Sequence, residues 1–266
     1  MIRSISFSSI MLMLGGLILA STLATTTALA SDREKERRWA EQVIDGLLDG
    51  DAVWIDDGSG NDFLGILTEG DPESGRAVLL MHGIGVHPNW PDVIYPLRVG
   101  LLEQGITSLS IQMPILANEA ESVDYLPLFA EVPGRIDAAL RTLNEAGYGE
   151  ITLVAHSMGA AMTVYYLAQE PSAAIDSVII IGMGPGIEGN ENIERLRQVD
   201  LPLLDLYGGD DLEAVRASAD QRAAAGGESN AGYQQLRVEA ANHFFQGHEA
   251  ELKQRVSDWL VTRAER

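Results

Sequence analysis

The sequence predicts an α/β protein with a mainly parallel central sheet that is flanked by helices on both faces. Apolar segments of strand length alternate with amphipathic helical segments from residue 77 to residue 262, and this alternation is typical of parallel sheets covered on both sides. Residues 151–160 (ITLVAHSMGA) run from an apolar strand through a serine directly into a helix. No internal repeat, low-complexity stretch or linker interrupts the pattern, so the sequence predicts one domain.

The N-terminal 30 residues differ from the rest of the chain. Arg3 precedes a short apolar run at residues 10–20, and Ala28-Leu29-Ala30 matches the small-x-small pattern of a signal-peptide cleavage site. An uncleaved membrane anchor is the alternative, but the apolar run is short for a bilayer span. We therefore expect a signal peptide over residues 1–30, a periplasmic or secreted location, and no stable membrane insertion after cleavage.

Composition narrows the function classes. The chain has 266 residues and a formal net charge of −21 at pH 7. Removal of residues 1–30 takes away one positive charge, that of Arg3, which gives −22 for the 236 residues that follow. This acidity argues against nucleic acid and anionic membranes as partners. The absence of cysteine excludes disulfides, so the hydrophobic core must stabilise the domain alone.

The first predicted elements are a helix and a strand hairpin. Residues 31–49 place Trp39, Val43, Ile44 and Leu47 at helical spacing, which predicts an amphipathic helix. Residues 52–56 and 63–69 form two short apolar runs separated by the turn residues DGSGN.

The remaining elements follow from the alternation of apolar runs and amphipathic segments. Strands are expected at residues 77–82, 107–112, 151–156, 177–182, 203–207 and 235–239. Helices are expected at about residues 93–104, 133–146, 158–169, 188–198, 213–225 and 247–262.

Two long connections mark the expected ligand-binding edge of the sheet. Residues 83–92 (GIGVHPNWPD) and residues 113–132 both follow predicted strands, and open α/β sheets bind ligands at the carboxyl ends of their strands. Residues 182–201 leave room for one helix, so no large lid domain is expected.

Ser157 is the expected nucleophile. It lies at the turn between a strand and a helix, where its hydroxyl would be exposed above the sheet edge. The turn requires small neighbours, and Ala155 and Gly159 meet this need. The N-terminus of the following helix would stabilise developing negative charge. The alternative is an ordinary serine that caps the helix.

The acid of a catalytic triad is expected at Asp211. It follows the strand at residues 203–207 in a glycine-rich turn. Asp210 is the alternative, because it lies in the same turn. Asp205 lies inside the strand and would be buried there, so it is not expected to face the site.

His243 is the expected base, in the loop after the strand at residues 235–239. A nucleophilic serine needs such a base and a carboxylate that orients it. The chain order Ser157, Asp211, His243 is the order of a nucleophile-elbow hydrolase. The backbone N–H groups of Ile84 and Met158 are the expected oxyanion donors.

The other histidines have weaker cases. His82 is expected to hold the oxyanion loop, and His156 to point away from Ser157. His87 is expected to stabilise its turn or contact substrate, and His248 to lie at the surface. Five aromatic residues could line a pocket or belong to the core, namely Trp90, Tyr125, Phe129, Phe244 and Phe245.

These motifs together resemble the α/β-hydrolase superfamily. The resemblance rests on the A-x-S-x-G turn around Ser157, the His82-Gly83 loop, the Gly-x-x-Asp turn that ends at Asp211, and the late His243. It implies an α/β-hydrolase domain over residues 31–266. Ala155 departs from the commonest motif, in which glycine is usual.

A narrower resemblance rests on the run from His82 to Pro114, which includes the segment HPNWP at residues 87–91. It looks like an uncharacterised bacterial family of exported α/β-hydrolase-like proteins, classified as a domain of unknown function. This resemblance implies the fold and hydrolase chemistry, and no substrate.

The sequence predicts a serine hydrolase that cleaves a carboxylic ester of a small-molecule acyl substrate through an acyl-enzyme. A thioesterase, amidase or acyltransferase would use the same residues, and a non-catalytic binding or assembly protein is the alternative from another class. The serine excludes an aspartate nucleophile. No metal-ligand spacing and no dinucleotide fingerprint occurs, so no cofactor is expected.

Overall fold

The structure is a computed structural model that describes residues 30–169 and 171–264. All but the last residue of the expected signal peptide therefore lies outside the described residues. Within the described ranges, none of the helices combines the length and the apolar character that a bilayer span requires.

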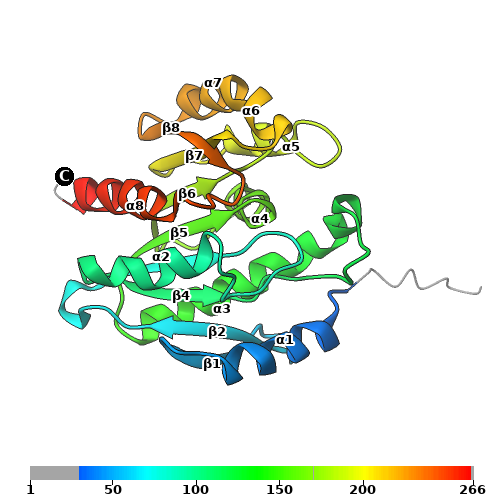
Figure 1. Cartoon of the computed structure of the whole chain (residues 1–266), viewed down its shortest axis with the longest axis vertical. Coiled ribbons are helices and arrows are strands. Elements are labelled where there is room, and N and C mark those ends of the chain that lie inside the picture. The colour runs from blue at the N-terminus through cyan, green and yellow to red at the C-terminus, as the bar shows by residue number, and fades with distance from the viewer. Residues whose placement is uncertain (1–29, 170, 265–266) are drawn as a thin grey trace, which may run out of the picture.

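An eight-stranded sheet forms the centre of the protein, in the order β1-β2-β4-β3-β5-β6-β7-β8 (Figure 1). The six strands from β3 to β8 are parallel to their neighbours, whereas the hairpin β1-β2 joins the sheet antiparallel to β4. The strands are β1 (Asp51–Asp56), β2 (Asp62–Thr68), β3 (Arg76–Met81), β4 (Thr107–Ile111), β5 (Glu150–His156), β6 (Ile175–Ile181), β7 (Leu203–Asp210) and β8 (Tyr233–Asn242).

Helices cover both faces of the sheet. The helices α3, α4 and α5 pack on one face, and α2 and α8 pack on the other; α7 packs against α5 and β8. The helices are α1 (Arg33–Asp45), α2 (Ile94–Gly100), α3 (Val132–Glu145), α4 (Met158–Leu167), α5 (Glu191–Leu196), α6 (Glu213–Ala217), α7 (Ala219–Ser229) and α8 (Glu249–Ala264), with short 3₁₀ helices η1 (Pro72–Ser74), η2 (Leu101–Gln104) and η3 (Ser122–Glu131).

Alternation along the strands explains why both faces are apolar. In β3, Leu79 and Met81 face the α3 and α4 side, while Val78 and Leu80 face the α2 and α8 side. Successive side chains of a strand point to opposite faces, so a continuous apolar run requires helices on both. This confirms the predicted fold class.

The structure differs from the predicted elements at several boundaries. Strand β8 begins two residues before and ends three residues after its expected range of 235–239, and the expected helix at residues 93–104 is α2 followed by η2. Strand β7 continues to Asp210, three residues beyond its expected end. The expected helix at residues 213–225 is two helices, α6 and α7, that meet at Ser218. The connection at residues 113–132 contains η3, in which Pro127 removes a backbone donor.

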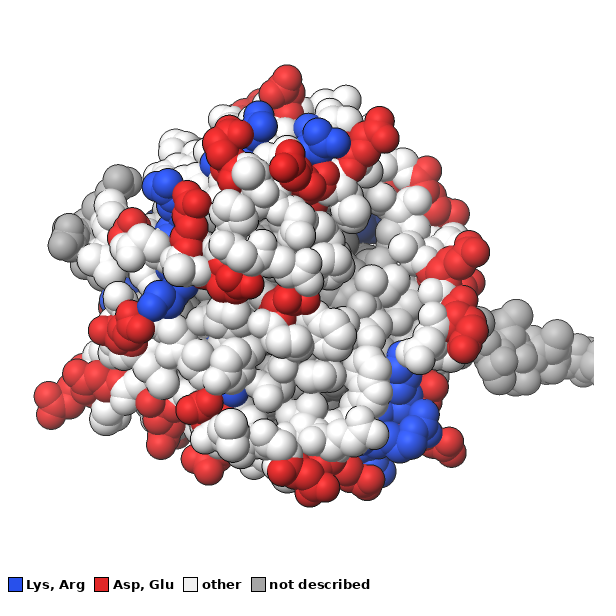
Figure 2. Space-filling model, viewed as in Figure 1, with Lys and Arg blue, Asp and Glu red and all other residues white. Residues whose placement is uncertain are grey.

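The surface is acidic, as the net charge requires. Figure 2 shows acidic side chains around most of the rim of one face, with basic side chains gathered over α1. Arg37 and Arg38 are exposed residues of α1.

Candidate active site

Ser157 lies on a strained turn between β5 and α4. Its backbone angles, a φ of 56° and a ψ of −119°, lie outside the regions that residues other than glycine adopt freely. A Cβ added at Gly159 would lie 2.7 Å from the Met81 carbonyl oxygen and closer still to that of His82. Only glycine therefore allows α4 to begin this close to β3. Ala155 is fully buried in the core beneath the turn, so its extra methyl group is accommodated.

Three side chains from distant parts of the sequence meet at this turn. The Nε2 atom of His243 lies 2.9 Å from the Ser157 Oγ, and its Nδ1 atom lies 2.6 Å from the Asp211 Oδ1. Because Nδ1 faces a carboxylate, it carries the proton, and Nε2 is left as the acceptor for the serine hydroxyl. The arrangement has the connectivity of a nucleophile, its base and an orienting acid.

Asp211 is the carboxylate that contacts His243, and Asp210 is not. Asp211 is buried and accepts backbone N–H bonds from Leu212 at 2.7 Å and from Gly208 at 3.2 Å. Burial alone would raise the pKa of the Asp211 carboxyl, but the hydrogen bonds from His243 and the two amides lower it overall. Asp210 is the exposed last residue of β7.

Asp205 is buried as predicted but is paired. Its Oδ2 accepts hydrogen bonds from Arg222 Nε at 2.8 Å, from the Tyr233 hydroxyl at 2.8 Å and from Gln235 at 2.9 Å. These partners tie β7 to α7 and β8, away from the His243 ring.

His82 fixes the loop that leads to Ile84. Its Nε2 accepts a hydrogen bond from the Met113 N–H at 2.9 Å, so its Nδ1 carries the proton and donates to the Gly83 carbonyl at 2.8 Å. Burial lowers the pKa of His82 to about 3, so the ring stays neutral. This contact holds the loop at the edge of the sheet above β3.

A cavity of about 330 Å³ opens beside the serine. Its walls come from the loop after β3, the start of η3, the elbow and the loops after β7 and β8. The lining residues are Gly83, Ile84, Val86, Trp90, Ser122, His156, Ser157, Met158, Leu212, His243 and Phe244. The expected oxyanion donors, Ile84 and Met158, thus share the cavity with Ser157.

Much of the cavity lining is apolar, and among the described residues that form it there is no lysine, arginine, aspartate or glutamate. Leu212 is 54% exposed and Phe244 is 40% exposed. Of the five aromatic residues considered from the sequence, Trp90 and Phe244 line the cavity, whereas Tyr125, Phe129 and Phe245 are buried in the core.

His156 contacts His243 rather than the Ser157 hydroxyl. Its Nε2–H donates to the His243 carbonyl at 2.9 Å, and the two rings lie 4.9 Å apart. Burial lowers the pKa of His156 to about 4, so it stays neutral. His87 lies outside this cavity, where its ring sits between Trp39 and Trp90. His248 lies in the turn before α8, 3.8 Å from Glu251.

Four residues of the site were not identified from the sequence. Val86, Ser122 and Leu212 line the cavity, and Gly182 lies beneath the His243 ring. Gly182 has a φ of +62°, and an added Cβ would lie 3.1 Å from two ring atoms of His243. A glycine directly after an apolar strand is the local signal that could have identified it.

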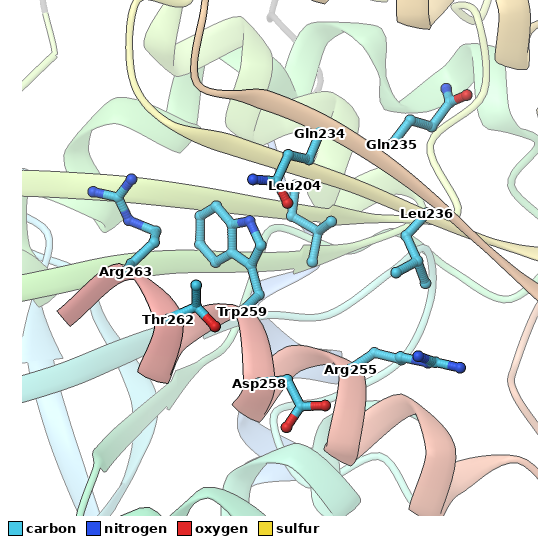
Figure 3. A pocket seen from close by; sticks show the side chains of 9 residues that line it. All are labelled: Leu204, Gln234, Gln235, Leu236, Arg255, Asp258, Trp259, Thr262 and Arg263. Atoms are coloured by element: carbon cyan, nitrogen blue, oxygen red, sulfur yellow. The ribbon is translucent and has the colours of Figure 1, made fainter. Parts of the chain in front are cut away.

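A second cavity, of about 240 Å³, lies between α8 and the first residues of β7 and β8 (Figure 3). Figure 3 shows Trp259 projecting from α8 toward Leu204. The start of these parallel strands is opposite the edge that carries Ser157, and this cavity holds none of the triad residues. Among the described residues no group of three histidine or acidic side chains is arranged to hold a metal.

A family model described as protein of unknown function (DUF3530) matches residues 19–126 and 127–262. The chain belongs to this family. The DUF3530 match covers most of the chain, including Ser157, Asp211 and His243. A comparison with curated proteins found no match.

Solved structures place the DUF3530 chain in the α/β-hydrolase fold. Est1E from Butyrivibrio proteoclasticus is 13% identical with a TM-score of 0.64, and the match covers 82% of this chain and all of that one. An esterase from Pyrococcus furiosus is 15% identical with a TM-score of 0.66, covering 80% and 92%. A dienelactone hydrolase from Anabaena variabilis is 21% identical with a TM-score of 0.64, covering 80% and 97%.

Proposed function

We propose that this protein is a serine hydrolase that cleaves a carboxylic ester through an acyl-enzyme. The observation that carries the proposal is the chain of hydrogen bonds from Ser157 to His243 at 2.9 Å and from His243 to Asp211 at 2.6 Å. Esterases among the structural neighbours of the chain support the reaction class, as does a strained serine at a helix N-terminus.

In the proposed mechanism, Ser157 Oγ attacks the ester carbonyl while His243 Nε2 takes the hydroxyl proton. Asp211 stabilises the positively charged imidazole. The backbone N–H groups of Ile84 and Met158 stabilise the tetrahedral oxyanion. His243 then gives its proton to the leaving alcohol, which departs as the acyl-enzyme forms. Water then attacks the acyl carbonyl while His243 takes its proton, and His243 returns this proton to Ser157 Oγ as the carboxylic acid leaves.

An uncharged, compact ester fits the cavity best. Its volume of about 330 Å³ lies near the lower end of the range for small-molecule sites. Its apolar walls favour an aliphatic or aromatic acyl group. Arginine and lysine side chains are common partners for the phosphates of a carrier thioester, and the described residues that line the cavity include neither. This observation favours the ester over a carrier thioester.

Labelling with a fluorophosphonate probe tests whether the serine is reactive. We expect the wild-type protein to be labelled and Ser157→Ala to lose labelling and p-nitrophenyl butyrate hydrolysis. Ser59→Ala, in the exposed turn between β1 and β2, is the matched control and should keep both. A wild-type protein that neither reacts with the probe nor hydrolyses short esters would support a binding or assembly protein instead.

Substrate class is tested by comparing kcat/KM for p-nitrophenyl esters of increasing acyl length with kcat/KM for acyl-coenzyme A thioesters. We expect short esters to be preferred, because the cavity has room for roughly ten non-hydrogen atoms. A preference for the coenzyme A thioesters would contradict the proposed substrate class. We also propose that the enzyme works in the periplasm or outside the cell, on the basis of the signal-peptide pattern at residues 1–30.

A further inference from the structure

Ser31, the residue that follows the expected cleavage site, is held by a carboxylate. Ala30 is exposed, whereas Ser31 is only 5% exposed. The Ser31 backbone nitrogen lies 2.8 Å from Glu131 Oε1, and its hydroxyl lies 2.8 Å from Glu131 Oε2. Both oxygens of one side chain are therefore directed at the first residue of the mature chain.

The surrounding cluster has one more negative than positive side chain. Fully buried Arg135 bonds Glu36 at 2.9 Å and lies 3.4 Å from Glu131. Arg33 bonds Glu131 at 2.8 Å and lies 3.4 Å from Asp57. Three carboxylates thus face two guanidinium groups, which leaves a net charge of −1. Burying unbalanced charge is costly, and burial raises the pKa of Glu36 despite its contact with Arg135.

We propose that Glu131 is the binding site for the α-ammonium group that cleavage after Ala30 creates at Ser31. An export-associated peptidase hydrolyses the Ala30–Ser31 peptide bond while the chain is still unfolded. Water supplies the hydroxyl of the Ala30 carboxyl group and one proton of the Ser31 amine, and the amine takes a further proton from solvent. The resulting positive charge balances the cluster and converts a neutral N–H donor into a charged one.

This ammonium site anchors the long connection over the catalytic cavity. Glu131 is the last residue of η3, and Ser122, the first residue of η3, lines the cavity. The adjoining residues of the N-terminal segment bind the same connection, because Asp32 N–H donates to the Ile115 carbonyl at 2.7 Å and Lys35 Nζ donates to the Leu116 carbonyl at 2.6 Å. In Figure 1 the blue start of the chain lies beside this green connection.

The reactivity of the Ser31 α-amine can be measured directly, because the cleaved chain contains only three primary amines. These are the α-amine of Ser31 and the side chains of Lys35 and Lys253. The full-length chain would be exported from a bacterial host, and its intact mass is expected to show Ser31 as the first residue. Reductive methylation with ¹³C-formaldehyde should modify the α-amine at least tenfold more slowly in the folded protein than in urea, with Lys253 as the internal reference.

Titration of the ¹³C-methylated amine then tests Glu131. We expect the α-ammonium pKa to lie above the ordinary value of about 8 and to return to it in Glu131→Gln, with faster methylation. Glu145→Gln, at the exposed end of α3, is the matched control and should leave both unchanged. If Glu131→Gln does not fold, Glu131→Asp keeps the charge but withdraws it, and should give an intermediate pKa.

Two results would overturn the inference. One is an exported protein that begins at a residue other than Ser31. The other is an α-amine whose pKa and methylation rate are the same in the wild type and in the Glu131 variant. Neither readout depends on ester hydrolysis, so the test stands apart from the proposed catalytic activity.

Discussion

The His243 loop is held in place by contacts that lie outside the triad itself. Ala240 and Phe245, on either side of His243, both have positive φ values, of 57° and 53°. Residues other than glycine adopt a positive φ only at an energetic cost, which the surrounding structure must offset. The hydrogen bond from His156 to the His243 carbonyl at 2.9 Å is one such contact. We therefore propose that His156 is a positioning residue for His243, the proposed base.

Replacing His156 should lower kcat more than it changes KM. In His156→Phe the His243 carbonyl loses a buried donor, which costs about 1–3 kcal/mol, and the ring that accepts the Ser157 proton becomes less well placed. We expect kcat for p-nitrophenyl butyrate to fall about tenfold, and His156→Gln, which keeps a side-chain donor, to recover part of the loss. His248→Gln is the control. An unchanged kcat in His156→Phe would show that the loop does not need this contact.

We expect Gly182 to be needed for a different reason, because a side chain there would crowd the ring of His243, the proposed base. Gly182 has a positive φ of +62°, as several other glycines of the protein do. It differs from them in that a Cβ added here would lie 3.1 Å from the His243 ring. We expect Gly182→Ala to lose at least tenfold in kcat. Gly147→Ala is a matched control, since Gly147 also has a positive φ, of +96°, but its Cβ would meet nothing within 4 Å.

Both alanine variants should lose about 1 kcal/mol of stability from backbone strain, and only Gly182→Ala should lose activity. Thermal unfolding and p-nitrophenyl ester kinetics on the two purified variants measure these effects. Equal activities would mean that the His243 ring can move away from residue 182 without harm to catalysis.

At the scale of elements, β7 and the helices after it form the support for Asp211. The buried pair of Asp205 in β7 and Arg222 in α7 joins them at 2.8 Å, with both side chains fully buried. Arg222 also donates to the Val215 carbonyl in α6 and to the Ser218 hydroxyl, each at 2.7 Å. A single side chain thus fixes the break between α6 and α7 and ties both helices to the strand that leads to the acid.

Removing one partner of this pair should destabilise the domain strongly. Arg222→Leu leaves the Asp205 carboxylate buried without its cation, which costs about 3–5 kcal/mol. For a domain of this size, that corresponds to a fall in Tm of about 6–20 °C. The double variant Asp205→Asn, Arg222→Leu should recover part of the loss, because no charge is left unpaired. Additive losses in the double variant would show that the two side chains are not coupled.

At the scale of the whole molecule, local sequence patterns predicted the fold and the three side chains that meet at the Ser157 turn. Strand periodicity and the serine turn are local signals, and the positions of Asp211 and His243 follow from strand ends in a parallel sheet. Contacts that join distant segments carry no such signal. The Glu131 carboxylate contacts Ser31, which lies 100 residues away in the sequence, and the His243 carbonyl contacts His156, which lies 87 residues away. The local sequence around these residues therefore could not predict either contact.

The predicted boundaries of helices were wrong where side-chain hydrogen bonds, rather than the periodicity of the sequence, determine where a helix ends. Residues 213–225 keep the periodicity of an amphipathic helix throughout. At the junction of α6 and α7, however, the Ser218 hydroxyl donates a hydrogen bond to the Ala214 carbonyl at 2.7 Å. Such back-bonding competes with the helix ladder. The 3₁₀ helix η3 was missed because Pro127 and the surrounding loop residues are typical of irregular structure.

Three histidines held in buried or partly buried positions should make the whole domain sensitive to mild acid. Burial lowers the pKa of His82 to about 3 and the pKa values of His87 and His156 to about 4, from an ordinary value of 6.5. Below pH 6.5 the unfolded chain therefore binds protons that the folded protein does not, and stability falls as the pH falls. Each histidine contributes up to about 1.4 kcal/mol per pH unit until the pH reaches its folded pKa.

We therefore expect Tm to fall by about 5–10 °C per pH unit between pH 6 and pH 4.5, measured by circular dichroism. Glu36, whose pKa burial raises, acts in the opposite direction, because its folded form gains protons more readily. The Asp211 carboxyl contributes only at lower pH, since its pKa lies below its usual range. In His156→Gln the slope should be reduced by about a third, because His82 and His87 still contribute, whereas in His248→Gln it should be unchanged. A Tm that is constant over this range would mean that the three imidazoles are protonated in the folded protein as easily as in the unfolded chain.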